Sequence, residues 1–151
     1  MSIIMERLFM SILFGGMFAS MASGGALDSI DLNAYQWKHR LLFLFVPSEN
    51  DPAYLSLKSE IEHQPNEVLD RDLLVVHVPE KGEGRFGKER LSAGQVLSLW
   101  KHLSASPGQF TTILVGKDGD EKFRQTGMIR LKEIFQIIDA MPMRQQEMKK
   151  K

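Results

Sequence analysis

The hexapeptide LLFLFV, at residues 41–46, is the stretch of this 151-residue chain that decides its fold. All six of its residues are apolar, and phenylalanine and valine favour extended chain. A strand with one face in water would alternate apolar and polar residues, and this stretch does not. It therefore predicts a strand buried on both faces, as in a sheet with helices on either side.

Two similar runs follow along the chain, LLVVHV at residues 73–78 and FTTILV at residues 110–115. Each has the length of a strand, is rich in β-branched or aromatic residues and does not alternate cleanly. We interpret both as further strands of the same sheet, buried on both faces.

The segments between these strands have helix signals. Asp51 and Pro52 are typical of the N-cap and first residue of a helix, which residues 64–66 (QPN) then end. Ser92 is the expected cap of a second helix, which ends before residues 106–108 (SPG).

A hairpin and a final helix complete the pattern. Asp118 and Gly119 resemble a two-residue turn between the third strand and a fourth at residues 121–125. Apolar residues from Leu131 to Ile138 recur at helical spacing, and that helix stops near Pro142. The order β-α-β-α-β-β-α predicts two right-handed β-α-β crossovers followed by a hairpin and a covering helix. This is an α/β chain with a central mixed sheet, the core of the thioredoxin-like fold.

The segment KGEGRFGKER, at residues 81–90, matches glycine spacings of two phosphate-binding loops. Three residues separate its first glycine, Gly82, from the preceding strand, however, and the next helix begins only at Ser92. Glu89 also stands where a phosphate-binding P-loop needs serine or threonine. We therefore expect a charged loop here, with no nucleotide cofactor.

Composition excludes further classes of function. The chain has 19 basic and 19 acidic residues, a balance that gives no overall field for nucleic acid. It has no cysteine, and residues 46–51 (VPSEND) stand where redox-active relatives of this fold carry a thiol. Disulfide exchange and thiol peroxidation are therefore excluded.

The remaining residue types suggest no catalytic or metal site. The four histidines lack metal-ligand spacing, and His77 lies inside a predicted strand. No serine lies in the G-x-S-x-G sequence of a nucleophile elbow. The sequence therefore assigns no catalytic residue, cofactor or metal.

The first 26 residues have the order of a secretory signal peptide, with an apolar run followed by small residues. Small residues allow cleavage between Ala22 and Ala26, which would leave one domain over residues 27–151 with a short basic tail. The alternative is an uncleaved membrane anchor, although Ser11 and Gly15 interrupt the apolar run. We expect a periplasmic or secreted protein that meets a membrane only if this segment is retained.

The chain resembles a bacterial family labelled domain of unknown function 4174. The likeness is carried by residues 116–119 (GKDG) and 138–148 (IDAMPMRQQEM), and by residues 37–40 (WKHR) and 70–72 (DRD) ahead of two strands. It covers roughly residues 30–148. The resemblance implies an exported, thioredoxin-like domain, distantly similar to domains of animal extracellular sushi-repeat proteins, and implies no catalytic assignment.

Six residues form the candidate site. Arg144 either pairs with Glu147 or returns to Asp139 as a structural clamp, or it forms a cleft with Lys117. The favoured function is a non-redox module that binds a protein or peptide partner. The alternative is a cofactor-free enzyme or a small-ligand-binding stress protein. The sequence sets no oligomeric state. The candidate residues are Lys117, Asp118, Gly119, Asp139, Pro142 and Arg144.

Overall fold

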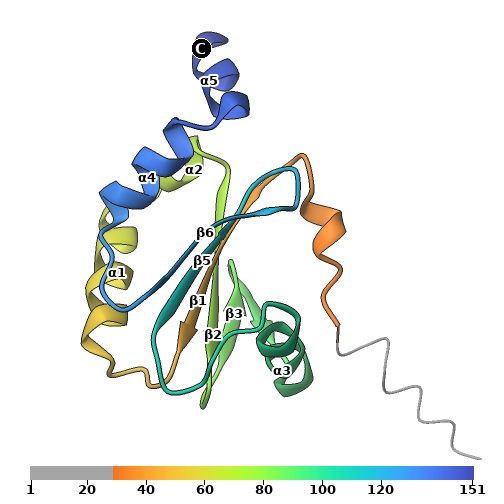
Figure 1. Cartoon of the computed structure of the whole chain (residues 1–151), viewed down its shortest axis with the longest axis vertical. Coiled ribbons are helices and arrows are strands. Elements are labelled where there is room, and N and C mark those ends of the chain that lie inside the picture. The colour runs from red at the N-terminus through yellow and green to blue at the C-terminus, as the bar shows by residue number, and fades with distance from the viewer. Residues whose placement is uncertain (1–28) are drawn as a thin grey trace, which may run out of the picture.

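The computed structural model describes residues 29–151, so the predicted signal peptide at residues 1–26 lies outside the described residues. A mixed six-stranded sheet with the order β4-β3-β2-β1-β5-β6 forms the centre of the molecule (Figure 1). Its strands are β1 (Arg40–Val46), β2 (Leu73–Pro79), β3 (Gly84–Phe86), β4 (Glu89–Leu91), β5 (Thr111–Val115) and β6 (Glu121–Thr126).

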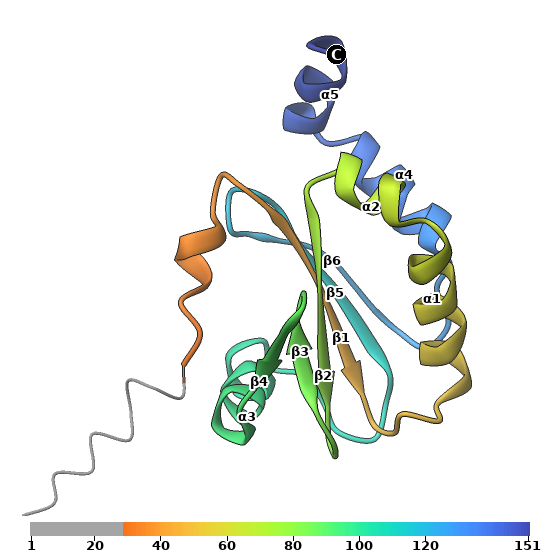
Figure 2. The same ribbon diagram turned by 180° about the vertical axis from the view of Figure 1, so that it is seen from behind.

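Strand β1 is buried along its whole length, as the LLFLFV stretch predicts. Leu42, Leu44 and Val46 face one apolar cluster, and Leu41, Phe43 and Phe45 face a second cluster on the other side of the sheet. Helices α1 (Pro52–His63), α2 (Pro65–Asp70) and α4 (Leu131–Asp139) lie on the first face, and α3 (Ala93–His102) lies on the second (Figures 1 and 2).

The predicted helix caps are confirmed. The Asp51 carboxylate accepts the Tyr54 N–H at 3.0 Å at the start of α1, and Ser92 forms a capping box with Gln95 at the start of α3. The QPN sequence ends α1, but Pro65 also begins α2, which sequence reasoning missed. Proline suits the first position of a helix as well as it ends the previous one, and α2 has no buried residue to give it an apolar stripe.

Only the first of the two expected crossovers joins parallel strands. Strand β2 runs parallel to β1, and helix α1 covers that connection. Strand β5 runs antiparallel to β1, so the prediction of a second β-α-β crossover was wrong. Periodicity identifies a strand but not its direction, which depends on partners distant in sequence.

Residues 82–90, expected to be a loop, form an antiparallel hairpin of β3 and β4 that extends the sheet beyond β2. A strand of three residues is too short to give a reliable alternating pattern. The glycines serve this hairpin. A Cβ atom at Gly84 would lie 2.6 Å from Val96 of α3, and Gly87 has φ +59° in the turn. Gly84 therefore lies within a strand, not at the start of a helix as a dinucleotide-binding loop requires.

The hairpin of β5 and β6 is confirmed, but its turn is not the expected two-residue type. The N–H of Gly119 donates to the carbonyl of Gly116 at 3.0 Å, and the N–H of Gly116 donates to Asp120 at 2.9 Å. Gly119 has φ +88°, which a side chain would disfavour. The longer turn places Lys117 and Asp118 at one end of the sheet, the same end as the start of β1.

The last helix of the core, α4, ends at Asp139, close to the predicted stop, and a further helix α5 (Pro142–Lys149) follows. None of the helices in residues 29–151 is long and apolar enough to cross a membrane.

Candidate functional site

The six candidate residues all lie at the end of the sheet where β1 begins and where α5 extends beyond it (Figure 1). Lys117, Asp118 and Gly119 come from the turn between β5 and β6, Asp139 ends α4, and Pro142 and Arg144 belong to α5.

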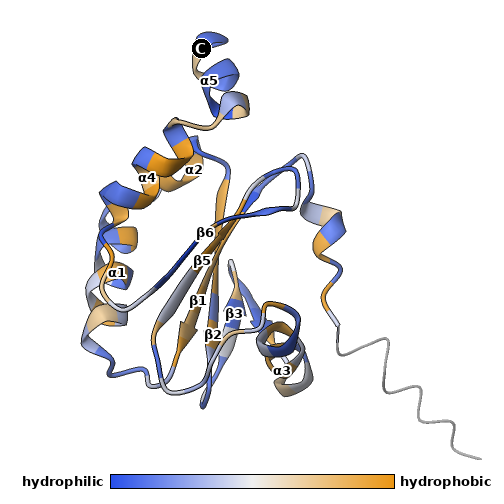
Figure 3. Ribbon diagram, in the orientation of Figure 1, coloured by the Kyte–Doolittle hydropathy of each residue, from blue (hydrophilic) through white to orange (hydrophobic). Residues whose placement is uncertain are grey.

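Helix α5 is held almost entirely by charge. Pro142 is its first residue, and the helix is mainly hydrophilic (Figure 3). Arg144 is the buried residue among the eight of α5, with 2% of its surface exposed. Because burial of an unpaired guanidinium is very unfavourable, the partners of Arg144 decide whether α5 can dock.

Arg144 returns to Asp139, one of the arrangements considered from the sequence. Its Nε donates to Asp139 Oδ1 at 3.1 Å. Its two terminal nitrogens reach Asp70 at the end of α2, one donating to the carbonyl at 2.8 Å and the other to the carboxylate at 2.5 Å. The pair with Glu147 also forms, more loosely, at 3.8 Å. The Arg144 side chain is thus fully engaged by groups of its own chain.

Asp139 joins Arg144 to a second buried arginine. Arg71 forms a two-point contact with the Asp139 carboxylate, at 3.0 and 2.7 Å. The Arg71 guanidinium also lies 4.0 Å from the centre of the Phe135 ring, and donates to Glu67. Asp139 therefore links α4, α5 and the segment before β2.

Glu147 forms a second centre of charge. It accepts from both terminal nitrogens of Arg40, at 3.1 and 3.2 Å, and from Lys117 at 2.7 Å. Arg40, the first residue of β1, is 1% exposed and donates a further bond to the Arg71 carbonyl at 2.8 Å. Lys117 also contacts Asp72 at 2.8 Å. We call the ion pairs of Arg40, Arg71, Lys117 and Arg144 with Asp70, Asp72, Asp139 and Glu147 the arginine network.

Sequence reasoning missed Arg40 and Arg71 as members of this network. The available signal was their position. Arg40 is followed at once by the apolar run at residues 41–46, and Arg71 lies two residues before the run at residues 73–78. A charge placed there must find a partner in the folded protein. The sequence does not show which carboxylate supplies it.

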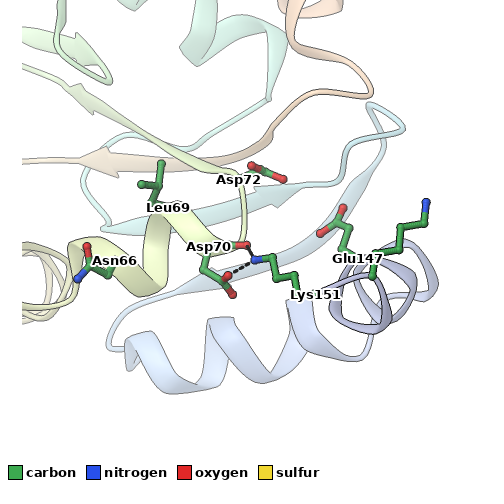
Figure 4. Close-up of a pocket in the computed structure, with 7 residues that line it drawn as sticks. Asn66, Leu69, Asp70, Asp72, Glu147 and Lys151 are labelled. Atoms are coloured by element: carbon green, nitrogen blue, oxygen red, sulfur yellow. Dashed lines mark hydrogen bonds and ion pairs between the residues drawn. The ribbon is translucent and has the colours of Figure 1, made fainter.

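The cavity beside Lys117 does not include Arg144. It has a volume of about 290 Å³ and is lined by Lys117, Asp118 and Pro142, so it differs from the cleft with Arg144 considered as an alternative from the sequence. A second hollow, of about 590 Å³, lies against Asp70, Asp72 and Glu147, with the terminal Lys151 paired to Asp70 across it (Figure 4). The charges around both hollows already neutralise one another, which favours a structural role for the network.

Ion pairing shifts the titration of the carboxylates. Burial opposes ionisation of Asp139 and Glu147, but hydrogen bonds from the arginines and from Lys117 outweigh it and hold the pKa of each carboxyl below its usual value. Hydrogen bonds from Lys151 and then Arg144 lower the pKa of Asp70 to about 2. The three groups are therefore ionised throughout the neutral range.

The turn beside the network exposes a tryptophan. Trp37 has φ +67°, a backbone conformation that a bulky residue rarely adopts, and 62% of its surface is exposed. The backbone N–H of Trp37 donates to the Lys117 carbonyl at 2.6 Å, and the side-chain amide of Gln36 donates to the Asp118 carbonyl at 2.7 Å. The turn of β5 and β6 thus holds Trp37 in a fixed, strained and solvent-facing position.

Residues 29–151 contain no cluster of three histidine, aspartate, glutamate or cysteine side chains suited to a metal ion. The arginine network is a set of matched charges. Large apolar side chains exposed at this end of the sheet include Leu69 and Trp37, and Trp37 is the one with a positive φ. Its chemistry suits contact with another molecule, not bond making or breaking.

We predict that Arg144→Ala lowers the free energy of unfolding by roughly 1–3 kcal/mol, because Asp139 and Asp70 lose a buried donor. Asp139→Ala should cost more, because it removes the one carboxylate that two buried guanidiniums share and leaves Arg144 with Asp70 and Arg71 with Glu67. The double variant should cost less than the sum of the two. Urea denaturation measures all three.

Arg90→Ala, which removes a 72% exposed side chain, is the control and should change stability by no more than about 0.5 kcal/mol. An unchanged midpoint for Arg144→Ala would contradict the clamp.

Acid should weaken the attachment of α5. A carboxyl whose pKa is lower in the folded than in the unfolded protein contributes stability that is complete above the unfolded pKa, about 4, and is lost as the pH falls through the folded pKa. The stability difference between the wild type and Glu147→Gln should therefore shrink as urea denaturation is repeated from pH 7 toward pH 2.5. A difference of the same size at both pH values would refute this assignment.

Known proteins with a similar fold include two parasite enzymes. The crystal structure of reduced 2-Cys peroxiredoxin from Plasmodium vivax superposes with a TM-score of 0.58 and 17% identity, covering 76% of this chain and 84% of that one. Thioredoxin peroxidase I of Plasmodium yoelii gives a TM-score of 0.56 and 15% identity, covering 76% and 79%. At these identities the likeness shows the fold alone, which is thioredoxin-like as expected.

The chain is also similar to coiled-coil domain-containing protein 80 of Danio rerio, with 28% identity over 133 residues and 78% of this chain. It spans only 15% of the length of that relative. The sequence of residues 31–147 matches one protein family. This range is most of the chain and includes the whole sheet and Glu147 of α5. The chain belongs to the family described as Domain of unknown function (DUF4174).

Proposed function

We propose that this protein is an exported, non-redox module of the thioredoxin-like fold that binds a protein or peptide partner through the surface around Trp37. The observation that carries the proposal is Trp37, whose indole is exposed and whose strained backbone is held by the turn of β5 and β6. The residues of this surface are Trp37, Lys38, Lys117 and Asp118.

The strained backbone at Trp37 lowers the stability of the protein, and its exposed side chain gives the fold little in return. Positive φ at a non-glycine residue costs on the order of 1 kcal/mol. Leu55, Leu97 and Met128 are also exposed, but their backbones are unstrained. Tryptophan is the residue type most enriched among those that dominate binding energy at interfaces, and a residue whose backbone is already held in place loses less entropy on binding. Both facts favour Trp37 as an anchor for a partner.

The proposal of a non-redox role rests on composition. The structural neighbours are named as a peroxiredoxin and a thioredoxin peroxidase, whereas this chain of 151 residues holds no cysteine. Thiol exchange passes through a mixed disulfide, which serine, glutamate or aspartate after β1 cannot form. A module with this fold and no thiol is suited to recognition.

The alternative of a cofactor-free enzyme using Lys117, Asp118 and Arg144 has less support. Lys117 is held by Glu147 and Asp72, and Arg144 by Asp70 and Asp139. Side chains neutralised in this way would have to break buried ion pairs before they could act on a substrate.

Export rests on the N-terminal sequence. Expressed in a Gram-negative host, the full chain should reach the periplasm and lose about 22–26 residues. N-terminal sequencing of the periplasmic fraction measures this. Recovery in the membrane fraction alone, with Met1 retained, would indicate the anchor instead.

Partner binding is tested with Trp37→Ala, which keeps the backbone N–H donated to Lys117 and should leave the unfolding midpoint nearly unchanged. Immobilised wild type should retain a specific protein from periplasmic extract. The purified partner should then bind Trp37→Ala at least about tenfold more weakly by calorimetry, the loss of roughly 1.4 kcal/mol or more typical of an anchor residue.

Leu97→Ala is the matched control, since Leu97 is 56% exposed on the far helix α3. It should bind the partner as the wild type does. Equal losses for both variants, or no specific protein retained by the wild type, would contradict the proposal.

A further inference from the structure

A third, open pocket lies at the opposite end of the sheet, where β1 and β2 finish and α1 begins. It has a volume of about 640 Å³, within the usual range for small-ligand sites. Its walls come from the segment after β1, one side of α1, strand β2 and the β3–β4 hairpin. The lining residues used below are Glu49, Tyr54, Lys58, Glu62, His77, Glu83 and Arg85.

The hairpin that sequence reasoning took for a loop creates this pocket. Arg85 of β3 pairs with His77 of β2, so the two side chains stand next to each other on the face of the sheet that α1 covers. Tyr54, in the first turn of α1, contacts His77 on this same face, and its hydroxyl lies 3.1 Å from His77 Nδ1. Without β3, His77 would lie at the edge of the sheet.

Charges in this pocket are available to a ligand, in contrast with those of the arginine network. The Lys58–Glu62 and Arg85–Glu83 pairs are 3.7 and 3.6 Å apart, longer than a hydrogen bond, and all four side chains are at least 42% exposed. Glu49 takes part in none of the ion pairs formed within residues 29–151.

Charges of both signs surround the two aromatic side chains of the pocket. Burial lowers the pKa of His77 to about 4, an effect that Lys58 and Arg85 strengthen and Glu62 opposes. Burial, aided by Glu49 and Glu62, raises the pKa of Tyr54, which places two carboxylates near the phenol. His77 and Tyr54 are thus both neutral at pH 7 and add hydrogen-bonding groups without adding charge.

We propose that this pocket binds a small zwitterion, a free amino acid or a short peptide, with its carboxylate toward Arg85 and its ammonium group toward Glu49. A simple anion would leave Glu49 unmatched, and a simple cation would leave Arg85 with only its loose pair to Glu83. A ligand with both groups satisfies both residues at once. This site is separate from the Trp37 surface and does not depend on the proposed function.

The test is calorimetric titration of the full chain with the standard amino acids and with the matching alanyl dipeptides. At least one zwitterion should bind, and the two sets distinguish a free amino acid from a peptide. The N-acetylated and the amidated forms of that ligand should bind at least about tenfold more weakly, since each lacks one charged group.

Arg85→Met should weaken binding by at least about tenfold, whereas Arg90→Met should leave it unchanged. Arg90 is the cross-strand neighbour of Arg85 and shares its contact with Glu83, but it does not line the pocket. Glu49→Gln, with Glu89→Gln as its control, tests the ammonium side without altering the hairpin strand. No binding by any zwitterion, equal binding of the blocked forms, or equal loss from Arg85→Met and Arg90→Met would overturn the proposal.

Discussion

A buried guanidinium at the start of the central strand is the constraint on which the C-terminal part of this structure depends. Arg40 is 1% exposed where β1 begins, and the carboxylate that matches it comes from Glu147, 107 residues later. An uncompensated charge in that position would be very unfavourable, so β1 can be buried at this end only when α5 docks. Lys117 also pairs with Glu147, and Arg71 and Arg144 share Asp139. These ion pairs explain why α5, a helix with so little apolar surface, has a fixed place.

The two ends of the sheet differ in how their charges are used. At the start of β1 the ion pairs are short and largely buried, and they join α2, α4, α5 and the turn of β5 and β6. At the end of β1 the pairs are loose and exposed around a larger cavity. Saturated charges stabilise a fold, whereas unsaturated charges can recognise a ligand. At the first end we propose a separate contact surface at Trp37, which depends on backbone hydrogen bonds and not on the network.

Much of the core could be predicted from residue patterns. The strands at LLFLFV, LLVVHV and FTTILV, the caps Asp51 and Ser92, and the amphipathic α4 all depend on neighbours within one or two turns or on periodicity. The hairpin of β3 and β4, the helix α2 and the helix α5 were missed or shortened, because none of them carries an apolar period. The return of Arg144 to Asp139 was one of the arrangements considered from the sequence, and it forms, but Arg71 and Asp70 were not foreseen as partners because they come from another part of the chain.

The sequence by itself determined the fold class, the capped helices and the exclusion of thiol chemistry, because composition and local periodicity are properties of the chain alone. Tertiary structure decided the antiparallel direction of β5, the partner of Arg40, the strained display of Trp37 and the pocket between α1 and β3. The physical reason is the same in each case. Strand direction and the neutralisation of buried charge are set by contacts between residues far apart in the chain, and a sequence read along its length does not show which distant residues will meet.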